Sequence, residues 1–77
     1  MNIEKDLRKL MSQIFEVKES EICDESSPHS IEKWDSLNHL KLALAIEKKF
    51  NFKFDNEDIP TLVSLKIISA TISSYVE

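Results

Sequence analysis

The sequence predicts a small all-α protein: a four-helix bundle with a long first loop and a short third helix. The chain has 77 residues, of which 42% are hydrophobic and 31% charged, a balance typical of one folded domain with a modest core. Its apolar residues recur mostly at helical spacing. Because no repeat, linker or low-complexity tract divides residues 1–77, we expect a single domain.

The first helix is predicted over residues 3–15, where apolar residues recur at steps of three and four. They are Ile3, Leu7, Leu10, Met11 and Ile14. Residues 16–35 are then predicted to form one long ordered loop, fastened to the core by Val17, Ile22, Ile31 and Trp34. So long a loop in so small a domain indicates a functional role or a short helical turn within it.

The central helix is predicted to follow Asp35 and to end at Phe50. Aspartate is a common N-cap residue, and an uninterrupted run of helix formers follows it. One apolar stripe consists of Leu37, Leu40, Leu44 and Phe50, and Leu42, Ala43, Ala45 and Ile46 broaden it. We therefore expect most of this helix to be buried at the centre of the fold.

Residues 51–64 are predicted to contain the short third helix. A cap at Asp55 or Asn56 begins it, and Pro60 prevents it from continuing beyond about Ile59. Ahead of this helix, an extended loop is predicted to insert two aromatic rings into the core: Phe52 and Phe54.

The last helix is predicted to begin after Ser64, which is a suitable N-cap residue. Its apolar residues again follow helical spacing: Leu65, Ile68, Ile72, Tyr75 and Val76. This helix would close the bundle.

Composition excludes several functional classes. The absence of glycine excludes the dinucleotide fingerprint and the P-loop, and the net charge of −4 disfavours binding to nucleic acid. One cysteine cannot form an internal disulfide, and two widely spaced histidines make no metal-ligand cluster. Neither a secretory h-region nor a membrane-spanning apolar run is present, so we expect a cytoplasmic protein without membrane insertion.

Ser36 stands at the first turn of the central helix, directly after the long loop. Backbone N–H groups there lack intrahelical partners, and the helix dipole favours negative charge, so a phosphodiester on this hydroxyl would be stabilised. The alternative is that Asp35 or Ser36 simply caps the helix, as such residues usually do.

The tetrapeptide Trp34-Asp35-Ser36-Leu37, opening a central amphipathic helix, resembles the acyl carrier protein family, whose attachment signature is Asp-Ser-Leu. The resemblance covers nearly the whole chain. It includes Glu47-Lys48-Lys49-Phe50 at the end of the central helix, the acidic stretch over residues 55–59 and the serine cap at Ser64.

This resemblance implies a carrier without catalysis of its own. A phosphopantetheinyl transferase would move 4′-phosphopantetheine from coenzyme A onto Ser36. The acyl group would then be bound as a thioester to this arm. Asp35 would help organise the metal and pyrophosphate in the transferase complex. The implied partners are this transferase, an acyl-loading ligase or synthase and acyl-transfer enzymes, and a monomer would suit a shuttle.

Two departures from the family pattern bear on partners. Many members have a glycine shortly before the aspartate, where this chain has Lys33-Trp34. Trp34 either packs as a lid on the core or forms a wall for the pantetheine arm or a partner contact. Residues 36–50 have a net charge of +2, unlike the acidic second helix usual in fatty acid carriers. Both departures favour a specialised lipid, polysaccharide or secondary-metabolite pathway.

Two interpretations are open for each of three further residues: Leu37, Lys41 and His39. Leu37 is either a partner contact at the foot of the arm or part of the core, and Lys41 is either a docking charge or simply solvated. Asp55 and Glu57 are candidate acidic contacts. His39 is expected to be a solvated helix residue, or a weak hydrogen-bond donor to a phosphate on Ser36.

Cys23 is expected to be a small buried or half-buried loop residue, and His29 has no visible role. Other functions stay open beside the leading one. An aminoacyl or peptidyl carrier would keep the fold, but peptidyl carriers usually have histidine before the serine, where this chain has Asp35. An unmodified helical interaction module is the alternative from another class. A DNA-binding domain is disfavoured by the net charge, and an enzyme acting alone is the least favoured.

Overall fold

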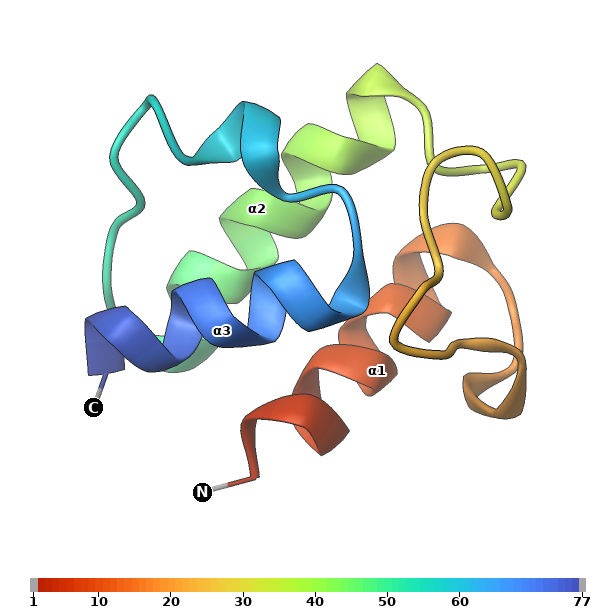
Figure 1. Cartoon of the computed structure of the whole chain (residues 1–77), viewed down its shortest axis with the longest axis horizontal. Coiled ribbons are helices and arrows are strands. Elements are labelled where there is room, and N and C mark those ends of the chain that lie inside the picture. The colour runs from red at the N-terminus through yellow and green to blue at the C-terminus, as the bar shows by residue number, and fades with distance from the viewer. Residues whose placement is uncertain (1, 77) are drawn as a thin grey trace.

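The computed structural model describes residues 2–76 and contains three α-helices and two 3-10 helices. The order is α1 (Ile3–Phe15), η1 (Glu19–Glu21), α2 (Ser36–Phe50), η2 (Ile59–Thr61) and α3 (Leu65–Val76). Figure 1 shows the long loop between α1 and α2 on one side of the molecule and the return from α2 through η2 on the other. The all-α prediction is confirmed, whereas the predicted third of four helices is only a 3-10 turn.

Helix α1 has the bounds that its apolar spacing predicts. Asn2 caps it, since the Asn2 side-chain oxygen accepts from the Lys5 N–H at 3.0 Å. Its buried residues are Leu7, Met11 and Phe15. At its C-terminal end Glu16 adopts the left-handed conformation, with φ of 55°, a position at which glycine is common in other proteins.

The loop over residues 16–35 is ordered and fastened as predicted. It contains η1, and its buried residues Ile22, Ile31 and Trp34 belong to the core. The Trp34 ring stacks on Phe15 of α1 with 4.9 Å between centroids. The prediction for Cys23 is wrong: its side chain is exposed, because Ile22 takes the inward position beside it.

Helix α2 has its predicted bounds but not its predicted orientation. The buried side consists of Leu42, Ala43, Ile46 and Phe50. Of the predicted stripe Phe50 is buried, but its other three members are exposed, at 64% for Leu37, 48% for Leu40 and 57% for Leu44. The helix is apolar around most of its circumference, and burying one side leaves the other in solvent.

Between α2 and α3 the chain turns back along α2 (Figure 1). Asn51 takes the left-handed conformation with φ of 58°, and Phe54 is buried while Phe52 is half-buried, as predicted for inserted rings. The predicted helix ending near Ile59 is wrong, because hydrogen-bonded turns cover residues 56–58 and η2 begins at Ile59. Pro60 lies inside η2, where the first turn requires no N–H donor.

Helix α3 begins after Ser64, as predicted. The Ser64 hydroxyl accepts from the Ile67 N–H at 3.2 Å, and the buried residues of the helix are Leu65, Ile68 and Ile72. Tyr75 near its end stacks on Phe52 with 4.8 Å between centroids and holds the segment before η2 against α3. Together α1, α2 and α3 enclose one core and leave the N-terminus of α2 at the surface.

Candidate functional site

Ser36 is the first residue of α2 and is exposed. The first backbone hydrogen bond of this helix runs from the His39 N–H to the Asp35 carbonyl oxygen at 2.8 Å. The Ser36 and Leu37 N–H groups precede that bond and therefore have no intrahelical partner. Within residues 2–76 the Ser36 hydroxyl has no hydrogen-bond partner. The site combines a free hydroxyl with the positive end of a helix dipole.

The start of α2 is held by two further hydrogen bonds. The Asp35 Oδ1 atom accepts from the Asn38 N–H at 2.9 Å, which makes Asp35 the N-cap. Asn38 in turn donates from Nδ2 to the Lys33 carbonyl oxygen at 2.7 Å. Because the loop and the first helical turn are tied together on both sides of Ser36, its backbone is fixed while its side chain is free. The N-cap interpretation is therefore correct for Asp35 and leaves Ser36 available.

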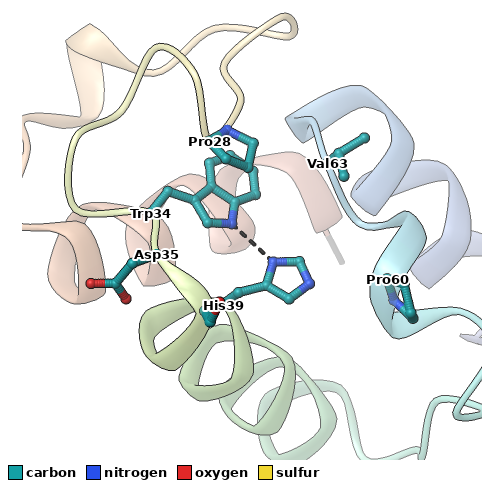
Figure 2. A pocket seen from close by; sticks show the side chains of 7 residues that line it. Pro28, Trp34, Asp35, His39, Pro60 and Val63 are labelled. Carbon is teal, nitrogen blue, oxygen red and sulfur yellow. Dashed lines mark hydrogen bonds between the residues drawn. The ribbon is translucent and has the colours of Figure 1, made fainter.

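An open groove of about 460 Å³ adjoins Ser36. Its lining is mainly apolar: Pro28, Trp34, Asp35, Ser36, His39, Pro60 and Val63. Figure 2 shows Pro28 and Trp34 on one side, Pro60 and Val63 on the other, and the His39 ring between them. The Asp35 carboxylate points away from this groove (Figure 2). The loop, α2 and η2 thus meet next to the free hydroxyl.

His39 is neither solvated nor free to bind a phosphate, and both predictions for it are wrong. Trp34 donates from Nε1 to Nδ1 of His39 at 2.9 Å, and Nε2 of His39 lies 2.7 Å from the Ile59 carbonyl oxygen. Trp34 itself is 3% exposed, so its predicted packing on the core is confirmed. Sequence reasoning missed this link because one of its acceptors is a backbone carbonyl twenty residues away.

The other predicted contacts lie outside the groove. Leu37 is exposed at the first turn of α2, so the alternative of burial in the core is wrong. Lys41 is also exposed, one turn further along the helix. Asp55 and Glu57 are exposed in the segment between α2 and η2, where the Asp55 N–H donates to the Tyr75 hydroxyl at 3.0 Å. The predicted site residues thus fall into a groove, a helix face and an acidic segment.

The imidazole that lines the groove beside Ser36 is not available as a catalytic base. Both ring nitrogens of His39 are engaged, and the described part of the chain holds no group of three or more metal-binding side chains. The shifted pKa values lie elsewhere: Lys33 lowers the pKa of Glu16, the Ser26 hydroxyl lowers that of the Cys23 thiol, and the Asp58 carboxylate raises that of Tyr75. No helix within residues 2–76 has the length and hydropathy needed to span a membrane.

Comparison with known proteins gives two relatives of similar length. The chain is 33% identical over 75 residues to the acyl carrier protein of Buchnera aphidicola subsp. Baizongia pistaciae (strain Bp), covering 97% of this chain and 96% of that protein. It is 33% identical over 61 residues to the acyl carrier protein of Buchnera aphidicola subsp. Schizaphis graminum (strain Sg), covering 79% and 77%. No family model matches the chain.

Proposed function

The chain belongs to the acyl carrier protein family, and from this premise we propose that it is a non-catalytic acyl carrier with 4′-phosphopantetheine attached to Ser36. The observation that carries the proposal is the free Ser36 hydroxyl at the exposed N-terminus of α2. An attached group must stand clear of the protein to visit other enzymes, and this position allows it.

The first turn of α2 also suits the phosphodiester that attachment creates. Two features there stabilise an anion: the unpaired N–H groups of Ser36 and Leu37, and the positive end of the helix dipole. The apolar groove beside Ser36 gives the linear arm a surface to rest on. The residues present therefore fit the group.

Attachment requires a second protein. The Ser36 oxygen forms a bond to the phosphorus that bears pantetheine in coenzyme A, the pyrophosphate bond breaks, and 3′,5′-adenosine bisphosphate leaves. The Ser36 proton passes to a base of the phosphopantetheinyl transferase, because both ring nitrogens of His39 in the adjoining groove are engaged. The chain is the substrate of that step and not its catalyst. When bound, the group supplies a terminal thiol that holds an acyl chain as a thioester.

Asp35 would support attachment from the side facing away from the groove. Its Oδ1 atom is the N-cap acceptor, which orients the carboxylate at the edge of the helix. The exposed carboxylate can then contribute an oxygen ligand to the Mg²⁺ that the transferase brings with coenzyme A. One side chain would thus both fix the helix start and help to dock the donor.

Partner enzymes would meet the exposed side of α2 next to Ser36. Leu37, Leu40 and Leu44 form its apolar part, and Lys41 lies among them. Exposed apolar side chains in a row mark interaction sites, and lysine at the rim selects partners with acidic surfaces. Trp34 would contribute only the ring edge that lines the groove.

The acidic residues Asp55 and Glu57 would make a second, separate set of contacts on the segment before η2. This arrangement, basic on α2 and acidic beyond it, supports a specialised pathway for lipid, polysaccharide or secondary-metabolite assembly over general fatty acid synthesis. Partners there would be a loading ligase or synthase and acyl-transfer enzymes, all in the cytoplasm.

The test is the intact mass of the purified protein after incubation with coenzyme A, Mg²⁺ and a broad-specificity phosphopantetheinyl transferase. We expect the wild type to gain one phosphopantetheine and Ser36→Ala to gain none. Ser20→Ala, which removes another exposed serine in η1, is the matched control and should gain one.

The proposal fails if Ser36→Ala is loaded as fully as the wild type, or if none of the three proteins gains mass. The second outcome would leave the N-terminus of α2 as a capped helix of an interaction module. A loaded protein that a D-alanine or other amino-acid ligase then charges, while acyl ligases do not, would place the chain among aminoacyl carriers.

A further inference from the structure

The His39 ring joins three segments beside Ser36. It accepts a hydrogen bond from Trp34 at the end of the loop and lies within hydrogen-bond distance of the Ile59 carbonyl in η2. Within residues 2–76 the His39–Ile59 contact is the one hydrogen bond that ties η2 to α2. Both sides of the groove are therefore linked through a single imidazole (Figure 2).

The two partners determine where the proton of the ring is. The Trp34 indole N–H is a donor only, so Nδ1 of His39 must accept and carries no hydrogen. The Ile59 carbonyl oxygen is an acceptor only, so Nε2 must carry the hydrogen. The arrangement therefore requires the neutral imidazole with its proton on Nε2.

We propose that His39 is a positioning residue: its neutral ring acts as a clasp that holds the loop and η2 on either side of the groove beside Ser36, and a second proton opens it. That proton can only go to Nδ1, where it would point at the Trp34 N–H. Two donors then face each other, and the Trp34–His39 hydrogen bond must break. The clasp therefore responds to protonation of this ring.

The charged surroundings of the ring are few. The titratable groups closest to the groove along the surrounding elements are Asp35 and Lys41 on α2, His29, Glu32 and Lys33 in the loop, Asp58 before η2 and Lys66 on α3. Asp35 points away from the groove, and the Asp58 carboxylate accepts from the Tyr75 hydroxyl. None of these groups is bonded to the ring, so the clasp depends on the protonation of His39 itself.

Opening the clasp would free the Trp34 end of the loop from α2 and widen the groove, while the hydrogen bond from Nε2 of His39 to the Ile59 carbonyl stays in place. Its consequence for cargo rests on the proposed attachment at Ser36: a closed groove would shelter the arm, and an open one would release it. The clasp itself is a property of the unloaded protein, so it can be tested without any attached group.

The chain has one tryptophan and two histidines, which makes the test direct. The parent for every variant is Ser36→Ala, which the proposed function predicts cannot be loaded. The indole N–H signal of Trp34 and its fluorescence are followed from about pH 8 to pH 5. We expect one step in both, with loss of the hydrogen-bonded shift of the indole N–H at low pH.

Two variants assign this step. His39→Gln retains a side chain that can accept and donate but does not titrate, and should abolish the step. His29→Gln removes the exposed histidine of the loop and should leave it unchanged. Amide exchange at Trp34, whose N–H donates to the Ile31 carbonyl oxygen at 3.1 Å, should quicken roughly fivefold across the step after correction for intrinsic rates, as expected for the loss of one hydrogen bond at this end of the loop. Exchange at Ile68 in α3 should not change.

The proposal is overturned if the step persists in His39→Gln or vanishes in His29→Gln. Nitrogen spectra of the histidine rings in the parent protein test it without any change at His39: a proton on Nδ1 of His39 at pH 8 would also overturn it. Failure of these tests leaves the loading result at Ser36 untouched, and failure of loading leaves these tests untouched.

Discussion

One side of α2 packs into the core through Ile46 and its neighbours, whereas the opposite side holds Leu37, Leu40 and Leu44 in solvent. Burying a leucine stabilises a protein by about 1.5–3 kcal/mol, so three exposed leucines are not what stability requires. The apolar residues of this helix therefore serve two different purposes. One side holds the fold together, and the other is the side on which we propose that partners dock beside Ser36.

The largest effect should come from the buried side. Ile46 is fully buried, and we expect Ile46→Ala to lower the free energy of unfolding by about 2–5 kcal/mol through lost burial and the cavity left behind. Urea denaturation followed by circular dichroism measures this loss. Leu44→Ala on the exposed side is the matched control, and equal losses in the two variants would remove the distinction between the sides.

A smaller effect should come from the start of α2, where Asp35 caps the helix and is also proposed to support attachment. Asp35→Ala removes the N-cap acceptor and should lower the free energy of unfolding by about 1 kcal/mol, whereas Asp35→Asn keeps a cap and should change it little. Because Asn lacks the charge proposed to face Mg²⁺, we expect both variants to load more slowly. If Asp35→Asn is loaded at the wild-type rate, the only role of Asp35 is to cap the helix.

The exposed side should affect loading more than stability. We expect Leu44→Ala and Lys41→Glu each to change the free energy of unfolding by less than about 0.5 kcal/mol. With a partner that docks on α2, either change should raise the KM for the carrier roughly two- to tenfold, with kcat little altered. Added salt should weaken the effect of Lys41→Glu only. An unchanged KM in both variants would argue against docking on this side.

The smallest effect should come from an exposed ion pair that belongs to neither side of α2. The Lys33 ammonium bonds to the Glu16 carboxylate and holds its pKa below the ordinary value of 4.5. A lowered folded-state pKa means that any stabilisation is present above the unfolded-state pKa and fades as the pH falls through the folded value. In Glu16→Gln, the free energy of unfolding should fall slightly less steeply as the pH is lowered. A large loss of that free energy at neutral pH would contradict this prediction.

The bounds of α1, α2 and α3 could be predicted because capping residues and helical spacing are local signals. The side of α2 that is buried could not. Leu37, Leu40 and Leu44 follow helical spacing as well as Leu42 and Ile46 do, so only contacts with the rest of the fold distinguish them.

The candidate site likewise has one part that the sequence predicts and one part that it does not. The exposed position of Ser36 follows from its place after a cap residue, which a sequence displays. The role of His39 depends on a loop residue and on the carbonyl of Ile59, which only folding brings together. Pro60 was expected to end a helix and instead lies within η2, since a first turn tolerates a residue without an N–H donor.

The contrast between the two sides of α2 is tested most directly by adding the transferase, with its coenzyme A site empty, to the 15N-labelled protein and following the amide signals. We expect the signals of Ser36, Leu37, Lys41 and Leu44 to shift first, while that of Ser12 on α1 stays in place. Shifts confined to α1, with the exposed side of α2 unchanged, would show that partners approach elsewhere and that its leucines are not a docking surface.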